Sequence, residues 1–402
     1  RSLTTGTALR RKLAFFLDFD STCTVKDTCC LIPMIHPERR QQDIWQQVSD
    51  QYLSLYEQTL NRLLLHQIEK DRSRQTSAIM PTMMTSSSSS PSRDDAPLTP
   101  ISQFVAPLSN VEYHGVNSTI DARCLSLISR QQLNQLGRQS PIRPSLQHFF
   151  QRVLPLCHRK EASLSITSAN WSYTVLYNCL SQLQVSNGAP LQFKLLNRLD
   201  NTELDAQIDV SKPWTNNRGT TETYEIPVYC NELEFNGKDV STGQFQLLQI
   251  VSSEEKWQCV DRELQRLAQQ ERYLLESPGD IDSNTSTATA ATDNGAVVIF
   301  VGDSLHDLYC LTKAHIGIVM TNSETQQVSS SLQKACDMLQ IRLLDITSQE
   351  AHDLIRQQVD HTTLVQPPSQ LEESDTKTLF VAQSWSQITL ALFSHQNIEN
   401  EI

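Results

Sequence analysis

Two aspartates stand two residues apart directly after an apolar run near the beginning of the chain. Asp18 and Asp20 follow residues 13–17, and a short apolar run of this kind is typical of a buried strand. Open α/β sheets bind ligands beyond the carboxyl ends of their strands. There one carboxylate can attack phosphorus, a second can donate and then remove a proton, and both can bind a divalent cation. Aspartates also serve in ordinary turns, so the pair alone leaves both interpretations open.

A second acidic cluster follows another apolar run, about 280 residues later. Residues 297–301 precede Asp303 and Asp307. The two clusters can converge if their strands are neighbours in one parallel sheet. Between them, a candidate strand at 163–168 ends in hydroxyl side chains, and Lys256 begins a charged segment. Each residue keeps a plainer alternative: Thr167 competes with Ser168, Lys256 could lie on a surface, and Asp307 could cap a helix.

The order of acidic pair, hydroxyl, lysine and acidic pair resembles the haloacid-dehalogenase (HAD) superfamily of phosphatases. Further segments match in order: DFDSTCTVKDT, IWQQVSDQYLSLYEQ, SITSANWS, VYCNELEF with a downstream STG, FVGDSLHDLYCLTKAHIGIVM and TLFVAQSWSQI. Together they are similar to the HAD domain of plant-type bifunctional thiamin-monophosphate phosphatases, where a TenA-type hydrolase precedes it. The similarity covers most of residues 13–390, except for two low-complexity loops and about 198–222. His306 departs from the small residue expected there.

This resemblance implies an α/β fold: a HAD-like Rossmannoid parallel sheet with an inserted helical cap of the C1 type. It implies a Mg²⁺-dependent phosphomonoester hydrolase that forms an aspartyl-phosphate, with thiamin monophosphate as substrate in thiamin diphosphate biosynthesis. Phosphoserine, pyridoxal phosphate or a nucleotide are alternative substrates, and an inactive HAD regulatory module is the non-enzyme alternative. The roles implied are Asp18 as nucleophile, Asp20 as general acid and base, Ser168 and Lys256 as phosphoryl-holding groups, Thr22 and Asn231 as substrate-binding groups, and Asp18, Asp20 (through its carbonyl), Asp303 and Asp307 as metal ligands.

The chain divides into a core at 13–27 and 141–395, a helical cap at 28–140, and a linker or transit remnant at 1–12. Within the cap we expect helices at 43–72 and 118–136, the second begun by the Ser118–Asp121 pair, and a disordered loop at 74–110. Trp45, Tyr52 and Tyr56 recur at helical spacing, as core residues or as a wall of the substrate site. Other expected elements are helices at 145–158, 170–184, 253–275 and 304–314, strands at 163–168, 224–235, 297–301 and 316–320, a turn at 236–237, an irregular stretch at 198–222 and a loop at 278–295.

Composition limits the partners. The chain has 402 residues, a net charge of −12 and a mean hydropathy of −0.37. Nucleic acids and anionic membranes require clustered basic residues, and no run of about 18 apolar residues predicts a membrane span. The partners that the resemblance implies are a small phosphomonoester and an upstream TenA-type domain. Ten cysteines without a CxxC pair indicate reduced thiols in the cytoplasm or in an organelle such as a mitochondrion or plastid.

Overall fold

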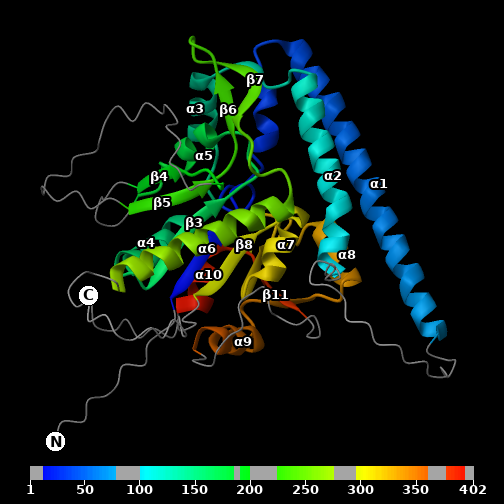
Figure 1. Ribbon diagram of the computed structural model, residues 1–402, viewed down its shortest axis with the longest axis vertical. Coiled ribbons are helices and arrows are strands. Elements are labelled where there is room, and N and C mark those ends of the chain that lie inside the picture. The colour runs from blue at the N-terminus through cyan, green and yellow to red at the C-terminus, as the bar shows by residue number, and fades with distance from the viewer. Residues whose placement is uncertain are drawn as a thin grey trace, which may run out of the picture.

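A computed structural model describes residues 12–77, 100–184, 191–199, 224–275, 296–360 and 377–393. Its centre is an eight-stranded sheet whose neighbouring strands all run parallel, in the order β10-β11-β9-β8-β1-β3-β5-β4 (Figure 1). The predicted α/β class with a parallel sheet and a helical insertion is confirmed. The strands are β1 (Leu13–Leu17), β3 (Ala162–Thr167), β4 (Leu191–Leu195), β5 (Tyr224–Tyr229), β8 (Val297–Gly302), β9 (Ile316–Met320), β10 (Arg342–Asp345) and β11 (Thr378–Ala382).

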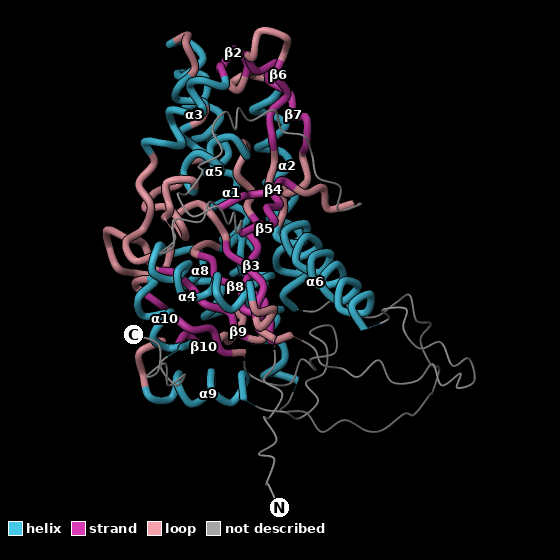
Figure 2. The backbone as a smooth tube through the Cα atoms, turned by 90° about the vertical axis from the view of Figure 1, so that its left-hand side faces the viewer, coloured by secondary structure: helices cyan, strands magenta, loops and turns pink. Residues whose placement is uncertain are grey.

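The central strands are apolar throughout because helices cover both faces of the sheet. Along β1, Leu13, Phe15 and Leu17 pack into one hydrophobic layer, while Ala14 and Phe16 pack into the opposite one. The first layer is closed by α4 (Leu146–His158), α5 (Tyr173–Leu180), α9 (Gln349–Asp360) and α10 (Trp385–Phe393). The second is closed by α6 (Ser253–Leu275), α7 (Leu308–Lys313) and α8 (Ser330–Met338), and Figure 2 shows α6 on the other side of the strands from α4 and α10.

Two long helices follow the first strand and its loop. After the short 3₁₀ turns Cys29–Leu31 and Pro33–Ile35, helix α1 spans Arg39–Ser77, and α2 spans Pro100–Asp121 beside it (Figure 1). The helix expected at 43–72 is confirmed and is longer at both ends. The loop expected at 74–110 was wrong for residues 100–110, which form half of α2, because Phe104, Val105 and Leu108 bury an apolar face against the sheet layer. Residues 78–99 lie outside the described part.

The helix expected at 118–136 was wrong. The Ser118–Asp121 pair lies in the last turn of α2, and Arg123 then adopts a positive φ of 58°, which ends the helix. A short strand β2 (Ser126–Ser129) follows, and α3 (Arg130–Gln139) begins with a capping box of Ser129 and Gln132. The capping box that begins a helix is therefore formed by Ser129 and Gln132, not by the Ser118–Asp121 pair that the sequence pattern favoured.

The single strand expected at 224–235 was also wrong. Its first half is β5 of the large sheet, and its second half is β6 (Glu232–Phe235), which pairs with β7 (Val240–Leu247). β7 also pairs with β2 of the insertion, so the large-sheet strand and the small antiparallel sheet meet at the turn of Cys230 and Asn231. The turn at 236–237 is confirmed as the β6–β7 hairpin.

The remaining expected elements agree closely with the structure. The helices at 145–158, 170–184 and 253–275 correspond to α4, α5 and α6, and the strands at 163–168, 297–301 and 316–320 to β3, β8 and β9. The helix at 304–314 is a 3₁₀ turn, Leu305–Asp307, followed by α7. Most of the expected irregular stretch at 198–222, the loop at 278–295 and the segment 1–12 lie outside the described residues.

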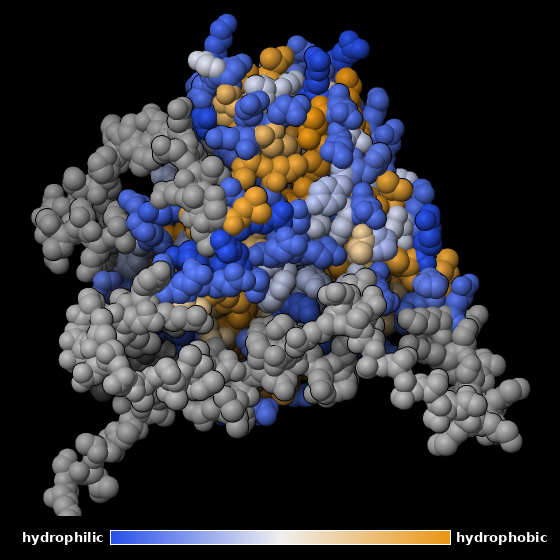
Figure 3. Space-filling model, viewed as in Figure 1, coloured by the Kyte–Doolittle hydropathy of each residue, from blue (hydrophilic) through white to orange (hydrophobic). Residues whose placement is uncertain are grey.

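The described surface is largely hydrophilic, and Figure 3 shows apolar side chains gathered over the small sheet and beside α2. All ten cysteines fall in the described part of the chain and none forms a disulfide. Of the helices that can be described, none combines the length and apolarity that a membrane crossing requires.

Candidate active site

The sheet register brings the sequence-distant candidates to one edge. Leu17 of β1 pairs with Val301 of β8 on one side and with Ile166 of β3 on the other. The residues that follow these strands therefore emerge together at their carboxyl ends, where open α/β sheets place their ligand sites. Asp18, Ser168 and Asp303 reach the site in this way, as the sequence predicted.

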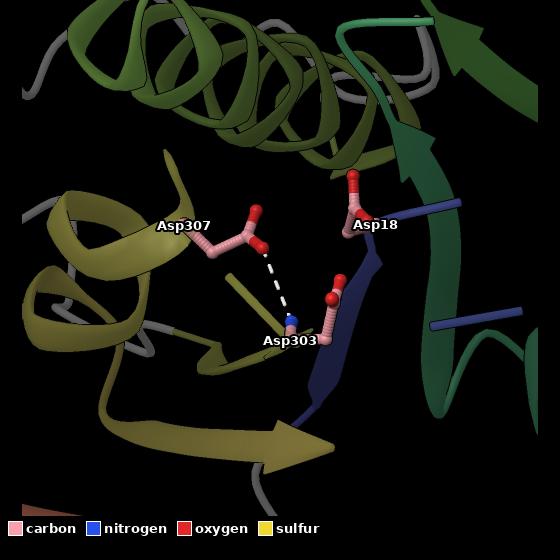
Figure 4. A group of neighbouring side chains, drawn as sticks. All are labelled: Asp18, Asp303 and Asp307. Carbon is pink, nitrogen blue, oxygen red and sulfur yellow. Dashed lines mark hydrogen bonds between the residues drawn. The ribbon is translucent and has the colours of Figure 1, made fainter. Parts of the chain in front are cut away.

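Three carboxylates form the floor of the site. Oxygen atoms of Asp18, Asp303 and Asp307 lie within 4.8 Å of one another (Figure 4). Asp307 Oδ2 accepts hydrogen bonds from the backbone amides of Asp303 and Ser304, at 3.1 Å each, and from the Ser304 hydroxyl at 2.9 Å. Asp307 therefore does cap this turn, through Oδ2, and its Oδ1 remains available to other partners.

Lys256 joins this floor from the first turn of α6. Its Nζ lies 2.7 Å from Asp18 Oδ1 and 2.6 Å from Asp307 Oδ1, and the side chain is 2% exposed. The surface-lysine alternative is thereby excluded. A buried lysine held by two carboxylates supplies fixed positive charge beside the atom that would attack a phosphoryl group.

The charges at this floor are unbalanced. Burial raises the pKa of Asp18 to about 6, although Lys256 opposes the rise. Burial, together with the charges of Asp18 and Asp307, raises the pKa of Asp303 well above its ordinary range. Burial would also raise the pKa of Asp307, but the Lys256 ammonium outweighs it and the net pKa is lowered. At Lys256, burial would lower the pKa, but the negative charges of Asp18 and Asp307 outweigh burial and raise it.

The donor set fits a hard divalent cation. Mg²⁺ prefers carboxylate oxygens and water, and one more positive charge would relieve the mutual repulsion that raises the pKa of Asp303. Asp18 and Asp303 are the residues best placed to hold it, because Asp307 is already engaged by Lys256 and by three amide or hydroxyl donors.

Asp20 lines the same cavity but is not one of the three clustered carboxylates. Its Oδ1 accepts from the Thr28 amide at 2.7 Å and the Thr28 hydroxyl at 2.6 Å, and its Oδ2 accepts from Asn170 Nδ2 at 2.7 Å. Burial, assisted by the charge of Asp27, raises the pKa of Asp20 to about 8 despite these bonds. Its carboxylate is therefore set up to carry a proton rather than to bind metal, and metal binding through its carbonyl stays a prediction.

Ser168 is the hydroxyl residue that lines the cavity above the floor. Its Oγ accepts from the Asn170 amide at 3.1 Å. The competing Thr167 is fully buried, does not line the cavity, and its Oγ1 lacks a hydrogen-bond partner in the described structure. The geometry favours Ser168 as the group that can donate to a phosphoryl oxygen.

Two expected substrate contacts are corrected. Thr22 is fully buried and its hydroxyl donates to Asp303 Oδ1 at 3.1 Å, so it orients a carboxylate instead of facing the cavity. The Asn231 amide bonds four backbone groups: the carbonyls of Ala169 and Ile250 and the amides of Gln249 and Ile250. Neither residue lines the cavity, and both hold its walls in place.

The cavity has a volume of about 540 Å³ and extends from the floor to the inserted helices. Trp45 and Tyr52 of α1 and Glu112 of α2 line it, so part of the helical stripe is cavity wall, while Tyr56 packs against the core. His306 also lines it, with Nε2 2.9 Å from the Val251 carbonyl.

Sequence reasoning missed several functional neighbours. Asn170 and Thr28 hold Asp20, and Trp171 lies on the cavity wall. Asn170 and Trp171 come directly after the third strand, so strand-end position was a usable signal for them. Glu112 had no such signal, because it lies in the middle of α2, between the loop expected at 74–110 and the helix expected at 118–136.

Comparisons with known proteins add structural likeness only. No protein-family model matches the chain, and no curated protein sequence matches it. A HAD family hydrolase from Salmonella enterica serovar Typhi shares 13% identity over 77% of this chain and 63% of its own, with a TM-score of 0.33. A phosphoserine phosphatase, solved as a phospho-aspartyl intermediate analogue, shares 11% over 81% and 91%, with a TM-score of 0.37. A Bordetella pertussis protein of unknown function shares 13% over 82% and 95%, also with 0.37. The chain thus spans less than two thirds of the Salmonella hydrolase.

Proposed function

We propose that the protein is a Mg²⁺-dependent phosphomonoester hydrolase of the HAD type. The observation that carries this proposal is the division of labour between two carboxylates of one loop. Asp18 lies beside Lys256 at the acidic floor, while Asp20 lies in the same cavity with its pKa raised by burial to about 8. One carboxylate is ionised and supported by a cation, and the other retains a proton at neutral pH.

In the proposed reaction, Asp18 and Asp20 act in both of two steps. In the first, an Asp18 oxygen attacks phosphorus, the ester P–O bond breaks, and Asp20 gives its proton to the departing alcohol. In the second, Asp20 takes a proton from water as that water attacks the aspartyl-phosphate, which releases phosphate and regenerates Asp18. Lys256 and Ser168 hold the phosphoryl oxygens throughout. A bound Mg²⁺ would neutralise the repulsion between an anionic ester and an anionic nucleophile.

The test is an assay of p-nitrophenyl phosphate hydrolysis with magnesium and with excess chelator. We expect turnover only with the metal, and a loss of about 1,000-fold or more for Asp18→Asn. Asp353→Asn, on the exposed face of α9, is the matched control and should stay within about twofold of wild type. Label from a ³²P-ester should remain on acid-quenched wild type and be absent from Asp18→Asn. Full activity of Asp18→Asn would show that Asp18 is not the nucleophile. A wild type that hydrolyses nothing, with or without magnesium, would favour the inactive regulatory module.

Within this function, we propose thiamin monophosphate as the substrate, as part of thiamin diphosphate biosynthesis, with the TenA-type domain as an upstream partner. The support is the sequence resemblance at 44–58 and 378–388 and the charge of the cavity. Among the described residues no arginine lines it, its lysine is engaged by Asp18 and Asp307, and His306 has its Nε2 2.9 Å from the Val251 carbonyl, so a substrate carboxylate such as that of phosphoserine finds no lysine or arginine free to bind it there. Catalytic efficiencies for thiamin monophosphate, phosphoserine, pyridoxal phosphate and nucleoside monophosphates decide this point. Thiamin monophosphate ranking tenfold below any other would end the substrate proposal and leave the phosphatase proposal intact.

A further inference from the structure

The cavity carries more negative charge than the reaction at its floor requires. Its acidic lining residues are Asp18, Asp20, Asp27, Glu112 and Asp303, against Lys256 and His306 as the only lining residues that can be cationic among those described. Lys256 and a bound metal would balance the floor. Asp27 is occupied as well, because its Oδ1 accepts from the Cys29 amide at 2.8 Å. Glu112 is not part of this floor, and the cations that act on its charge are His306 and Lys256, neither of which forms an ion pair with it among the described contacts.

Glu112 is held so that one oxygen is used and the other is open. Oε2 accepts the Tyr52 hydroxyl at 2.9 Å, and Oε1 has no hydrogen-bond partner in the described part of the chain. The described hydrogen bonds include none between His306 and Glu112, and His306 Nε2 lies 2.9 Å from the Val251 carbonyl. Burial raises the pKa of Glu112 above its ordinary value, opposed by His306 and Tyr52. A half-buried carboxylate in this state gains most from a positive charge brought by a ligand.

The orientation of Tyr52 is fixed by the packing of α1 on α2. Gly115 lies three residues after Glu112 on α2, and a methyl group at Gly115 would come within 2.7 Å of Tyr52 Cδ2. The ring therefore lies directly on the α2 backbone, next to the carboxylate it orients. In the same cavity, Trp45 and Trp171 form an edge-to-face pair with ring centroids 5.7 Å apart, and both line it. A cavity lined by aromatic rings and a carboxylate suits a large, weakly hydrated cation.

We propose that Glu112, oriented by Tyr52, is the specificity-determining residue of this cavity and selects phosphomonoesters whose alcohol carries a permanent positive charge. The inference rests on the proposed hydrolase function and adds the group that discriminates between substrates. Glu112 belongs to the inserted helices, and the reacting groups belong to the sheet edge. Selection of the alcohol and chemistry at phosphorus are thereby assigned to different parts of the molecule.

Two esters of the same shape and different charge test this proposal. Phosphocholine has a trimethylammonium group, and 3,3-dimethylbutyl phosphate has a neutral tert-butyl group at the same place. For wild type, we expect kcat/KM to favour phosphocholine by about tenfold or more. Glu112→Gln should bring the ratio of the two kcat/KM values to about one, and Tyr52→Phe should give an intermediate ratio, because the carboxylate stays but loses its orientation.

Glu57→Gln is the matched control, since it removes the same charge from an exposed position on α1 that does not line the cavity. It should keep the wild-type ratio, whereas a ratio lowered equally in Glu57→Gln and Glu112→Gln would show a long-range field and overturn the proposal. A wild-type ratio near one, or an unchanged ratio in Glu112→Gln, would also overturn it while both esters are still hydrolysed. Absence of metal-dependent hydrolysis of p-nitrophenyl phosphate would instead reject the hydrolase function itself. Calorimetric titration of Asp18→Asn, alone and combined with Glu112→Gln, repeats the comparison without turnover. Asp18→Asn alone should bind phosphocholine more tightly than the neutral ester, and the combined variant should bind both about equally; equal affinity in Asp18→Asn alone would contradict the inference.

Discussion

At the scale of single residues, Asp18 and Asp20 show how one loop can hold two carboxylates in different protonation states. Burial raises the pKa of both carboxyl groups. Asp18 has Lys256 at 2.7 Å, while Asp20 has neutral donors and the nearby charge of Asp27. The pKa of Asp18 is consequently about 6 and that of Asp20 about 8. The sequence predicted that the pair follows a buried strand, the roles of its two members stay a prediction, and the separation of their pKa values comes from neighbours that only the fold supplies.

The pH dependence of catalysis follows from these two values. Activity requires Asp18 to have lost its proton, so kcat/KM should rise as pH passes about 6; it requires Asp20 to keep its proton, so kcat/KM should fall above about 8. Saturating magnesium should move the lower limb to more acidic pH, because a cation stabilises the ionised form of Asp18. A pH profile of kcat/KM at two magnesium concentrations measures both effects. Rates that still climb beyond pH 9 would rule out Asp20 as the acid.

Gly302 tests how closely the acidic floor is packed. A Cβ at this position would lie 2.5 Å from Asp307 Cγ, so Gly302→Ala must displace the carboxylate that holds Lys256. We expect activity to fall by about 100-fold or more, as when catalytic groups are displaced by an ångström. Gly237→Ala is the matched control, because its Cβ would have no atom within 4 Å, and its activity should stay within about twofold of wild type. Comparable activity of the two variants would mean that Asp307 is not needed in its observed position.

At the scale of elements, the sequence predicted what local pattern determines. The charged helix at 253–275 and the strands ending in the acidic motifs were predictable because amphipathic periodicity and buried apolar runs are local properties. The break of 224–235 into β5 and β6 was not, because Asn231 forms its four backbone bonds with residues 169, 249 and 250. Those contacts exist only after the chain has folded. The same limit hid Glu112, whose hydrogen bond with Tyr52 on another helix forms only in the folded chain.

The last helix supports the catalytic loop, which gives an element-scale prediction. In α10, the buried Trp385 donates from Nε1 to the Thr22 carbonyl at 3.0 Å and packs on Phe149 of α4. Trp385→Phe keeps an aromatic ring but removes the donor and leaves a buried carbonyl unsatisfied, which costs about 1–3 kcal/mol. We expect this loss in urea unfolding, together with reduced kcat, because Thr22 orients Asp303. A variant with wild-type kcat and unchanged stability would show that α10 only covers the sheet.

At the scale of the whole molecule, the insertion and the sheet share their cores. Leu60 of α1 and Leu108 of α2 pack in the same hydrophobic layer as β8, and β2 of the insertion pairs with β7, which follows the large-sheet strand β5. Packing and strand pairing therefore join the expected cap at 28–140 to the expected core at 13–27 and 141–395. Sequence order alone could not show this, because it separates segments that the fold joins.

This shared packing identifies which part of the insertion can be removed. α1 and α2 pack along each other and reach the sheet layer through Leu60, Phe104 and Leu108, so their position does not depend on a particular connection between them. Residues 82–99 are rich in serine and poor in the aliphatic residues that form cores. Replacing them with a short Gly/Ser linker should keep p-nitrophenyl phosphate hydrolysis within about threefold and leave the urea midpoint nearly unchanged, since loop-closure entropy varies slowly with length. Leu108→Ala, in the same helix pair, should lower that midpoint by removing about 2–5 kcal/mol of buried contact. If the linker variant lost activity and solubility while Leu108→Ala did not, the connection itself would be structural, and the helices would owe their place over the cavity to it.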